Sequence, residues 1–292
     1  GIARVFAERG HTVSGSDRSA SEVTDSLRLA GVEVVLGHAA AHLGDADTVV
    51  FSSAVREENP EYVEALRRGL TVIHRSEALR WLLRGLSPLA VAGSHGKTTT
   101  TAMLATALER AGVDAGCVNG GVVSQWGVSS RTGTDELFVI EADESDRSFV
   151  GYNPLHVLIT NIAPDHLDFY GSLDVIYDAF EEFARTARKS VVLCADDPGT
   201  RELKARLNES VPVVTYGTDA DADVRITELS PGPHASFVVS AHGESTTVTL
   251  GVPGRLPALN ATGVVALLME LGFSLSDAGK AASGFLGADR RF

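Results

Sequence analysis

A phosphate-binding loop is indicated by residues 91–100, which read VAGSHGKTTT and lie between an apolar run and an amphipathic segment. A strand, a glycine-rich turn and a helix form the setting in which backbone N–H groups bind phosphate. In such a loop Lys97 would neutralise the β- and γ-phosphates, and the Thr98 hydroxyl would ligate Mg²⁺. The general pattern G-x-x-x-x-G-K-[ST] is incomplete, because Val91 stands at its first glycine. A plain glycine turn is the alternative, but a lysine in the first helical turn opposes the helix dipole unless an anion binds there.

Two further groups of polar residues follow apolar runs. Residues 141–146 read EADESD, and four carboxylates so close together repel one another unless divalent cations lie among their oxygens. Open α/β sheets place ligands at the carboxyl ends of parallel strands, although a solvated acidic loop is the alternative. The apolar run 155–160 leads towards His166, which lies between Asp165 and Asp168. This setting distinguishes His166 from the histidines outside these motifs, which we interpret as structural.

The composition argues against several classes of partner. With a formal net charge of -13, the chain offers no broad basic surface, so we expect no nucleic-acid partner. The apolar runs are strand-sized, so we expect no membrane insertion, and we expect no secretory signal. Two cysteines are too few for a disulfide framework, which favours a reducing compartment, the cytoplasm. The sequence gives no information about the oligomeric state.

Alternating strand and helix patterns predict an α/β fold in two domains. Residues 1–86 are expected to form a Rossmann-like domain. Because its first strand and glycine-rich turn do not precede Gly1, we expect this domain to be incomplete. Its elements are expected as a helix tail at 1–10, a helix at 21–30, and strands at 11–16, 32–36 and 48–53.

Residues 87–292 are expected to form an ATPase domain of the phosphate-loop type, with a mainly parallel sheet and a small antiparallel addition between 223 and 250. The boundary between the domains is expected at the turn before Ser87. The expected strands of this domain are 89–92, 137–142, 155–160 and 190–195, and its helices are 98–111, 173–188, 260–271, 276–286 and one after 198.

The segment GSHGKTTTT, residues 93–101, resembles the ATP site of the Mur ligase family, and this resemblance accounts for the missing first glycine. Residues 141–149, EADESDRSF, resemble the alanine-adding branch of that family. Residues 160–170, TNIAPDHLDFY, resemble the family motif TNI-x-x-DH-L/M-D-x-Y. The resemblance covers almost the whole chain. It implies ATP and Mg²⁺ as cofactors, a catalytic role for Lys97, Glu141 and His166, and metal ligation by Thr98, Glu141 and His166.

The resemblance also implies which residues contact the ligands. Those expected to contact the nucleotide are Gly93, Ser94, His95, Gly96, Lys97, Thr98, Thr99, Asn260, Arg290 and Arg291. Those expected to contact the UDP-sugar substrate are Asp17, Ser52, Ser53, Asp143, Glu144 and Ser145. In the segment before Asn260 the chain departs from the family, because Leu256 stands where the family has a histidine. The adenine contact that this histidine implies is therefore not expected in this chain. An ordinary helix N-cap is the alternative interpretation of Asn260.

These implied properties describe an ATP-dependent ligase. It would join the carboxylate of UDP-N-acetylmuramate to L-alanine through an acyl phosphate, in peptidoglycan synthesis, with a third domain for the amino acid expected beyond Phe292. Two alternatives stay open. One is a recycling ligase of the same family, which takes a tripeptide, and the other is a non-catalytic nucleotide-binding fragment.

Overall fold

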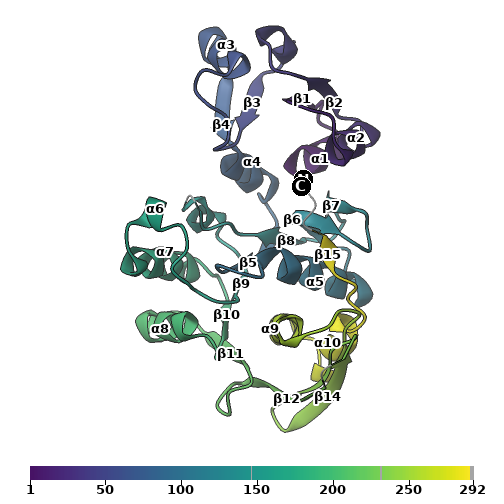
Figure 1. Cartoon of the computed structure of the whole chain (residues 1–292), viewed down its shortest axis with the longest axis vertical. Coiled ribbons are helices and arrows are strands. Elements are labelled where there is room, and N and C mark those ends of the chain that lie inside the picture. Colours follow the sequence, from purple (N-terminus) through teal and green to yellow (C-terminus); the bar gives the residue numbers. More distant parts are fainter. Residues whose placement is uncertain (146, 231, 290–292) are drawn as a thin grey trace. The chain divides into compact units, whose positions relative to one another are not determined.

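The computed structural model describes residues 1–289 except Asp146 and Pro231 (Figure 1). The chain divides into two compact units. The first comprises Gly1–Arg84 and Ser130–Thr132, and the second comprises Gly85–Ser129 and Gly133–Phe292. The sequence analysis placed the boundary between residues 86 and 87, and it gave no indication that a short piece of the later chain groups with the first unit.

The first unit contains two separate pairs of parallel strands. β1 (Ser14–Asp17) pairs with β2 (Glu33–Leu36), and β3 (Thr48–Phe51) pairs with β4 (Thr71–His74). The remaining elements are α1 (Ile2–Glu8), α2 (Glu22–Leu29), the 3-10 turn η1 (Ala40–Leu43), α3 (Pro60–Arg68) and α4 (Arg75–Leu82). The predicted alternation of helices with parallel strands is confirmed. The strand expected at 11–16 begins only at Ser14, and α3, β4 and α4 were not predicted.

Helix boundaries in this unit follow from their cap residues. The Ser21 side chain accepts a hydrogen bond from the Thr24 N–H, and the Thr24 hydroxyl closes a capping box at the start of α2. The Asn59 side chain caps α3, whose first residue is Pro60. Gly69, in the left-handed conformation, ends α3.

The second unit is built on a sheet that has 11 strands among the described residues, in the order β14-β13-β12-β11-β10-β9-β5-β8-β6-β15, with β7 paired to β6. From β6 to β12 neighbouring strands run parallel, whereas β13, β14 and β15 pair antiparallel. The strands are β5 (Ser87–Ala92), β6 (Gly116–Val123), β7 (Val128–Arg131), β8 (Leu137–Glu141), β9 (His156–Ile159), β10 (Ser190–Cys194), β11 (Val213–Gly217), β12 (Val224–Ser230), β13 (Ser236–Ala241), β14 (Glu244–Thr249) and β15 (Ala288–Asp289).

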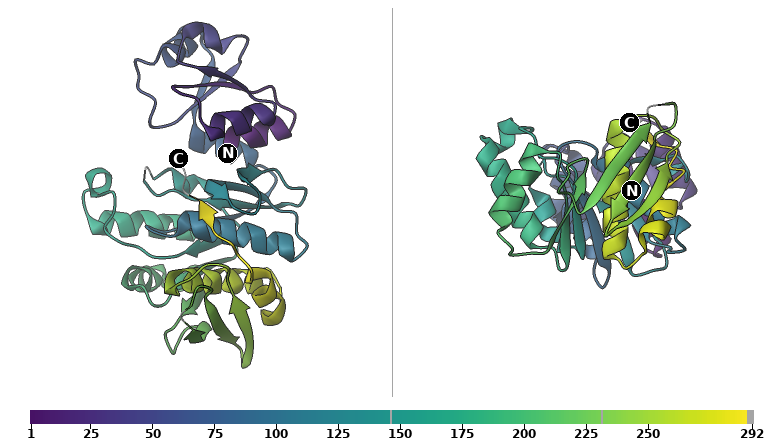
Figure 2. Two further views of the ribbon diagram at one scale, coloured as in Figure 1. Left: turned by 45° about the vertical axis from the view of Figure 1, so that its right-hand side comes forward. Right: turned by 90° about the horizontal axis from the view of Figure 1, so that it is seen from below.

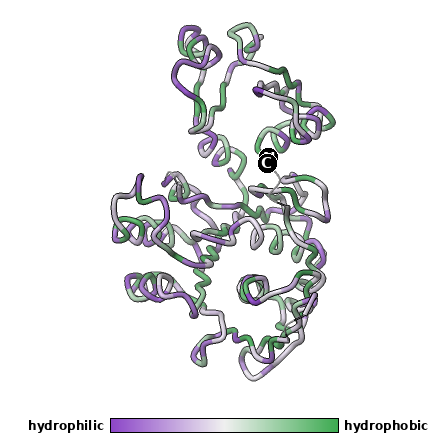
Figure 3. Tube along the Cα trace, viewed as in Figure 1, coloured by the Kyte–Doolittle hydropathy of each residue, from purple (hydrophilic) through white to green (hydrophobic). Residues whose placement is uncertain are grey.

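The mainly parallel sheet with an antiparallel addition is confirmed. Every residue of β9 and of β10 is buried, and hydrophobic residues dominate the central strands (Figure 3). Burial on both faces is what a parallel sheet covered by helices requires. The strands β6, β7, β11 and β15 were not predicted.

Helices cover both faces of this sheet (Figure 2). One face carries α5 (Lys97–Arg110), α9 (Arg255–Glu270) and α10 (Leu275–Ala282), which pack against one another. The other carries α7 (Leu173–Arg185) and α8 (Pro198–Leu207), and the short elements η2 (Ser148–Tyr152) and α6 (Leu167–Tyr170) contact α7. Among the described residues, no helix has both the length and the apolar character needed to cross a membrane.

The expected start of α9 was wrong. The sequence analysis began this helix at Asn260, but it begins at Arg255, with Gly254 as its N-cap residue. Pro257 lies in the first turn, where a missing N–H costs nothing because that group would have no intrahelical partner. The N-cap interpretation of Asn260 is therefore wrong, since its side chain projects from the second turn of the helix.

The packing of α9 on β11 predicts the effect of one added methyl group. Tyr216 is 1% exposed, and a Cβ at Gly263 would lie 2.8 Å from its Cζ. Overpacking at such a distance costs about 2–3 kcal/mol, which outweighs the roughly 1 kcal/mol by which alanine favours a helix over glycine. We therefore expect Gly263→Ala to lower the melting temperature. Gly15→Ala is the control, because a Cβ there meets no atom within 4 Å. Equal melting temperatures for both variants would contradict the packing argument.

Candidate functional site

The pairing of β5 brings three loops to one edge of the sheet. β5 runs parallel to β8 on one side, with Val91 opposite Glu141, and parallel to β9 on the other, with Ala92 opposite Ile159. The loops that leave these strands therefore emerge together. They are the predicted phosphate loop, the acidic loop and the loop that carries His166, so the structure brings together the three motifs that the sequence singled out.

Only glycine fits at position 93, the first residue after β5. Gly93 has φ +130°, and a Cβ there would lie 2.3 Å from Thr160 Oγ1. At the other end, Gly96 is the N-cap residue of α5 and makes no side-chain cap hydrogen bond. The start of α5 is thus a helix N-terminus of the kind that binds phosphate. Asn260 lies against it, since its Nδ2 is 3.2 Å from the place where a Cβ of Gly96 would be.

Asn161 holds the phosphate loop from the neighbouring strand end. Its side-chain Oδ1 accepts a hydrogen bond from the His95 N–H at 2.9 Å, and its Nδ2 donates to the His95 carbonyl at 2.8 Å. Its own carbonyl accepts from the Ser94 N–H at 3.0 Å. Ala163 N–H donates to Ser94 Oγ at 2.9 Å. The sequence analysis assigned Asn161 no role, although an amide directly after a buried strand, beside a phosphate loop, was a usable signal.

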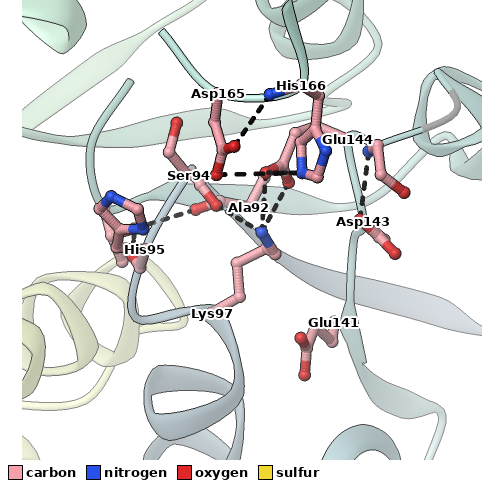
Figure 4. A network of polar contacts seen from close by, with 12 residues as sticks. Ala92, Ser94, His95, Lys97, Glu141, Asp143, Glu144, Asp165 and His166 are labelled. Carbon is pink, nitrogen blue, oxygen red and sulfur yellow. Dashed lines mark hydrogen bonds and ion pairs between the residues drawn. The ribbon is translucent and has the colours of Figure 1, made fainter. Parts of the chain in front are cut away.

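Lys97 reaches across the loop to the acidic segment (Figure 4). Its ammonium donates to the Gly93 carbonyl at 2.8 Å and to Glu144 Oε1 at 2.8 Å, and it lies 2.8 Å from Glu144 Oε2. Burial raises the pKa of Glu144, while the charge and hydrogen bond of Lys97 oppose this effect. The lysine thus pairs with Glu144, which the sequence analysis expected at the sugar substrate; no partner for Lys97 within the protein was predicted.

Glu141 is the last residue of β8, and its carboxylate lies against the start of α5. Its Oε1 accepts from the Thr98 hydroxyl at 3.0 Å, and its Oε2 accepts from the Gly120 N–H at 2.7 Å. A Cβ at Gly120 would lie 2.5 Å from Oε2, so only glycine allows this approach. A hydroxyl and a carboxylate side by side are the oxygen donors that Mg²⁺ prefers. Thr98 and Glu141 therefore fit a magnesium ion.

His166 approaches the site from the other side of Lys97, and Figure 4 shows it on the opposite side of the ammonium from Glu141. It has φ +53° and precedes α6. Its Nε2 lies 3.9 Å from Glu144 Oε1 and 4.0 Å from Asp165 Oδ2. In the part of the chain that the structure describes, no three His, Cys, Asp or Glu residues are grouped closely enough to hold a metal ion. That Glu141 and His166 serve one metal cluster stays a prediction.

Comparison with known families identifies this arrangement. Residues 91–268 match the Mur ligase middle domain, and residues 1–86 match a model described as the catalytic domain of the Mur ligase family. The chain belongs to the Mur ligase family. The family resemblance inferred from the three motifs is confirmed.

Individual Mur ligases resemble the whole of this chain. The UDP-N-acetylmuramate--L-alanine ligase of Clavibacter sepedonicus is 49% identical over 292 residues, which are 100% of this chain and 61% of that protein. The UDP-N-acetylmuramate-alanine ligase of Thermotoga maritima has a structure with a TM-score of 0.89 at 32% identity, covering 100% of this chain and 66% of that one. The chain therefore spans less than two thirds of the length of these relatives.

A Mur ligase named for a different substrate has nearly the same fold. The UDP-N-acetylmuramate:L-alanyl-gamma-D-glutamyl-meso-diaminopimelate ligase of Neisseria meningitides gives a TM-score of 0.86 at 29% identity, covering 99% of this chain and 95% of that one. Overall structure alone does not separate the two substrates.

The residues expected to contact the sugar substrate lie in both units. In the first unit, Asp17 ends β1, Ser52 follows β3, and the Ser53 hydroxyl lies 3.1 Å from His74 Nε2. In the second, Asp143 Oδ1 accepts from the Ser145 N–H at 3.1 Å. Their contact with substrate stays a prediction. Among the residues expected at the nucleotide, Thr99 lies in the first turn of α5, and Arg290 and Arg291 lie outside the described residues.

Asp196 connects β10 with the loop after β11 and with α9. Its Oδ1 accepts from the Thr218 N–H at 2.8 Å and from the Asp219 N–H at 3.1 Å. Its Oδ2 accepts from the Thr218 hydroxyl at 2.8 Å and from the Arg255 guanidinium at 3.3 Å. Burial opposes ionisation, but these hydrogen bonds together outweigh it and hold the pKa of Asp196 below its ordinary value of 3.8. The sequence analysis missed this residue.

We expect Asn161→Asp to loosen the phosphate loop. The variant keeps an acceptor for the His95 N–H but places a carboxylate oxygen against the His95 carbonyl, which loses the Asn161 donor while the Thr160 hydroxyl still donates to it at 2.7 Å. Replacing this exposed hydrogen bond by repulsion between two oxygens costs on the order of 1 kcal/mol, so we expect Mg-ATP binding to weaken severalfold. Titration calorimetry measures this. Asn208→Asp, the same change at the C-terminal cap of α8, should bind like the unsubstituted chain. If Asn161→Asp does so too, the loop does not depend on this side chain.

We expect Asp196→Asn to lower the melting temperature by about 2–6 °C near pH 7. Because the folded chain lowers the pKa of Asp196, its ionised form adds stability above pH 3.8, and that stability is lost as the pH falls through the folded pKa. The difference between the variant and the unsubstituted chain should therefore shrink in acid. Asp174→Asn is the control, since this carboxylate is 85% exposed and its pair with Arg206 contributes little. A difference that persists unchanged to pH 3 would contradict the assignment.

Proposed function

We propose that a protein containing this chain joins L-alanine to UDP-N-acetylmuramate with the hydrolysis of ATP to ADP and phosphate, in peptidoglycan synthesis. The observation that carries the proposal is the phosphate loop with Lys97 at its centre and the Thr98–Glu141 pair beside it, at the carboxyl edge of a parallel sheet. Relatives that bear this activity in their names support the choice of substrates.

In the proposed reaction the muramic acid carboxylate attacks the γ-phosphorus of ATP, and ADP leaves. The acyl phosphate then reacts with the alanine amine, the C–N bond forms, and phosphate departs. Lys97 would bind the β- and γ-phosphates, and the N–H groups at the start of α5 would bind phosphate oxygens. Asn260, which lies beside Gly96, would contact the nucleoside. No side chain has to form a covalent bond with the substrate.

Thr98 and Glu141 would hold Mg²⁺, and His166 would hold a second ion. When bound, Mg²⁺ offsets the negative charge that develops on the transferred phosphoryl group. The Thr98 hydroxyl donates to the Glu141 carboxylate at 3.0 Å, so the two groups that would hold the ion lie side by side.

A peptide-recycling ligase is the second candidate, because the TM-scores of 0.86 and 0.89 are nearly equal. The alanine-adding reaction is favoured by sequence, since identity is 49% to the alanine ligase of Clavibacter sepedonicus and 29% to the Neisseria meningitides ligase. We propose the cytoplasm as the location, because two cysteines in the whole sequence are too few for a disulfide framework.

ADP release tests the function. The chain would be completed at both ends with the corresponding segments of the Clavibacter sepedonicus relative and supplied with Mg-ATP and UDP-N-acetylmuramate. We expect release to require L-alanine and not the tripeptide.

Lys97→Ala should reduce the rate of ADP release by at least about a thousandfold, because the lysine cation stabilises the negative charge of the transferred phosphoryl group. Its affinity for UDP-N-acetylmuramate should stay near that of the unsubstituted protein.

Lys280→Ala is the matched control, since this lysine is 75% exposed on α10 and pairs with Asp277. It should release ADP at the unsubstituted rate. Release that requires the tripeptide would replace the proposed substrate by the second candidate. Full activity of Lys97→Ala would remove the phosphate loop from the mechanism.

A further inference from the structure

Oxygen atoms of the protein surround the Lys97 ammonium. Its side chain is 11% exposed, and the Glu144 side chain is 3% exposed. The Gly93 carbonyl takes one N–H, and both carboxylate oxygens of Glu144 lie 2.8 Å from Nζ. An ammonium has three N–H groups, so these contacts use most of its hydrogen-bonding capacity.

Glu144 is held in this position by its backbone as well as by its charge. The hydroxyl of Tyr170 donates to the Glu144 carbonyl, and so does the Arg147 N–H at 3.1 Å. The carboxylate loses most of its hydration on burial, and its attraction to Lys97 offsets that loss. The Lys97 charge and the position of Glu144 therefore depend on each other.

A phosphate oxygen that reached Lys97 would meet the Glu144 carboxylate. Two anions around one ammonium in a buried site repel each other strongly, because the local dielectric is lower than that of water. We propose that Glu144 occupies the place of a nucleotide phosphate oxygen at Lys97, and that nucleotide binding displaces it. This inference rests on the proposed ATP site and adds to it a residue that sets nucleotide affinity.

The displaced carboxylate has a second polar group close by. His166 Nε2 lies 3.9 Å from Glu144 Oε1, so a carboxylate displaced towards it by about 1 Å would face the second ion that His166 is proposed to hold. Figure 4 shows the imidazole beside the carboxylate, on the side away from the Lys97 stem. Displacement therefore requires a small side-chain movement and no rearrangement of the strands.

A Glu144 carboxylate that competes for Lys97 would make the site selective among anions. A single phosphate offers one group to exchange for Glu144, whereas a polyphosphate also binds the N–H groups of the loop and the start of α5. Glu144 would therefore exclude orthophosphate and admit ligands with several phosphates. It would also keep the buried lysine paired between turnovers.

Titration calorimetry on the chain Gly1–Phe292 tests the proposal, with Mg-ATP, tripolyphosphate and orthophosphate as probes. Glu144→Gln keeps the shape of the side chain but removes the competing charge. We expect Mg-ATP and tripolyphosphate to bind this variant at least about tenfold more tightly. The reason is that the ligand no longer has to replace the charge-assisted hydrogen bond between Lys97 and the Glu144 carboxylate. We expect orthophosphate to bind measurably only to the variant.

Two controls separate competition from general electrostatics. Glu182→Gln removes the same charge from an exposed pair with Arg147, and it should leave all three affinities unchanged. In a Lys97→Met background, Glu144→Gln should no longer strengthen binding, because burial raises the pKa of Glu144 and without the lysine it favours the neutral carboxyl, which glutamine resembles. Glu144→Asp, which withdraws the carboxylate by one methylene, should also bind Mg-ATP more tightly, and it serves as a second variant if Glu144→Gln folds poorly.

The outcomes are distinct. Tighter binding by Glu144→Gln that disappears with Lys97→Met supports the proposal. If the unsubstituted chain binds Mg-ATP and neither Glu144 variant binds it more tightly, the proposal is overturned and the ATP site stands. Weaker binding by both variants would make Glu144 a nucleotide ligand and would overturn the competition. Absence of Mg-ATP binding in every variant would refute both the ATP site and this inference.

Discussion

Parallel pairing of β5 with β8 on one side and β9 on the other is the constraint on which the site depends. Parallel strands end at the same edge of a sheet, and three consecutive strands in the order β8-β5-β9 therefore place three loops side by side. The phosphate loop is the middle one. Its neighbours supply the Glu144 carboxylate from one side and the Asn161 amide from the other. Any change in strand order would separate residues that are 47 and 66 positions apart in sequence.

Close backbone approach is the second requirement. The loop after β9 lies so near the phosphate loop that a Cβ at Gly93 would lie 2.3 Å from Thr160 Oγ1 and 2.9 Å from the Asn161 carbonyl oxygen. At this distance Asn161 accepts hydrogen bonds from the Ser94 and His95 N–H groups, and these bonds fix the shape of the phosphate loop. A preformed loop loses less conformational freedom when it binds phosphate.

The hydrogen bonds of Asp196 connect the end of β10 to the first turn of α9. They join it to Thr218 and to Arg255, the first residue of the helix. One turn later the same helix presents Asn260 to Gly96. A carboxylate outside the phosphate loop thus helps to position the helix that borders it, in the way that supporting shells orient the ligands of a functional site.

By itself, the sequence determined the α/β class, the position of the phosphate loop, the acidic segment and His166, because periodicity, glycine spacing and clustered charge are local properties of a chain. Family resemblance added the roles of individual residues. The tertiary structure alone decided that Lys97 pairs with Glu144 and that Thr98 pairs with Glu141. It also decided that Asn161 braces the phosphate loop and that α9 begins at Arg255. These features depend on strand order, on backbone approach and on which charges become buried together, and none of these is fixed until residues distant in the sequence have packed against one another.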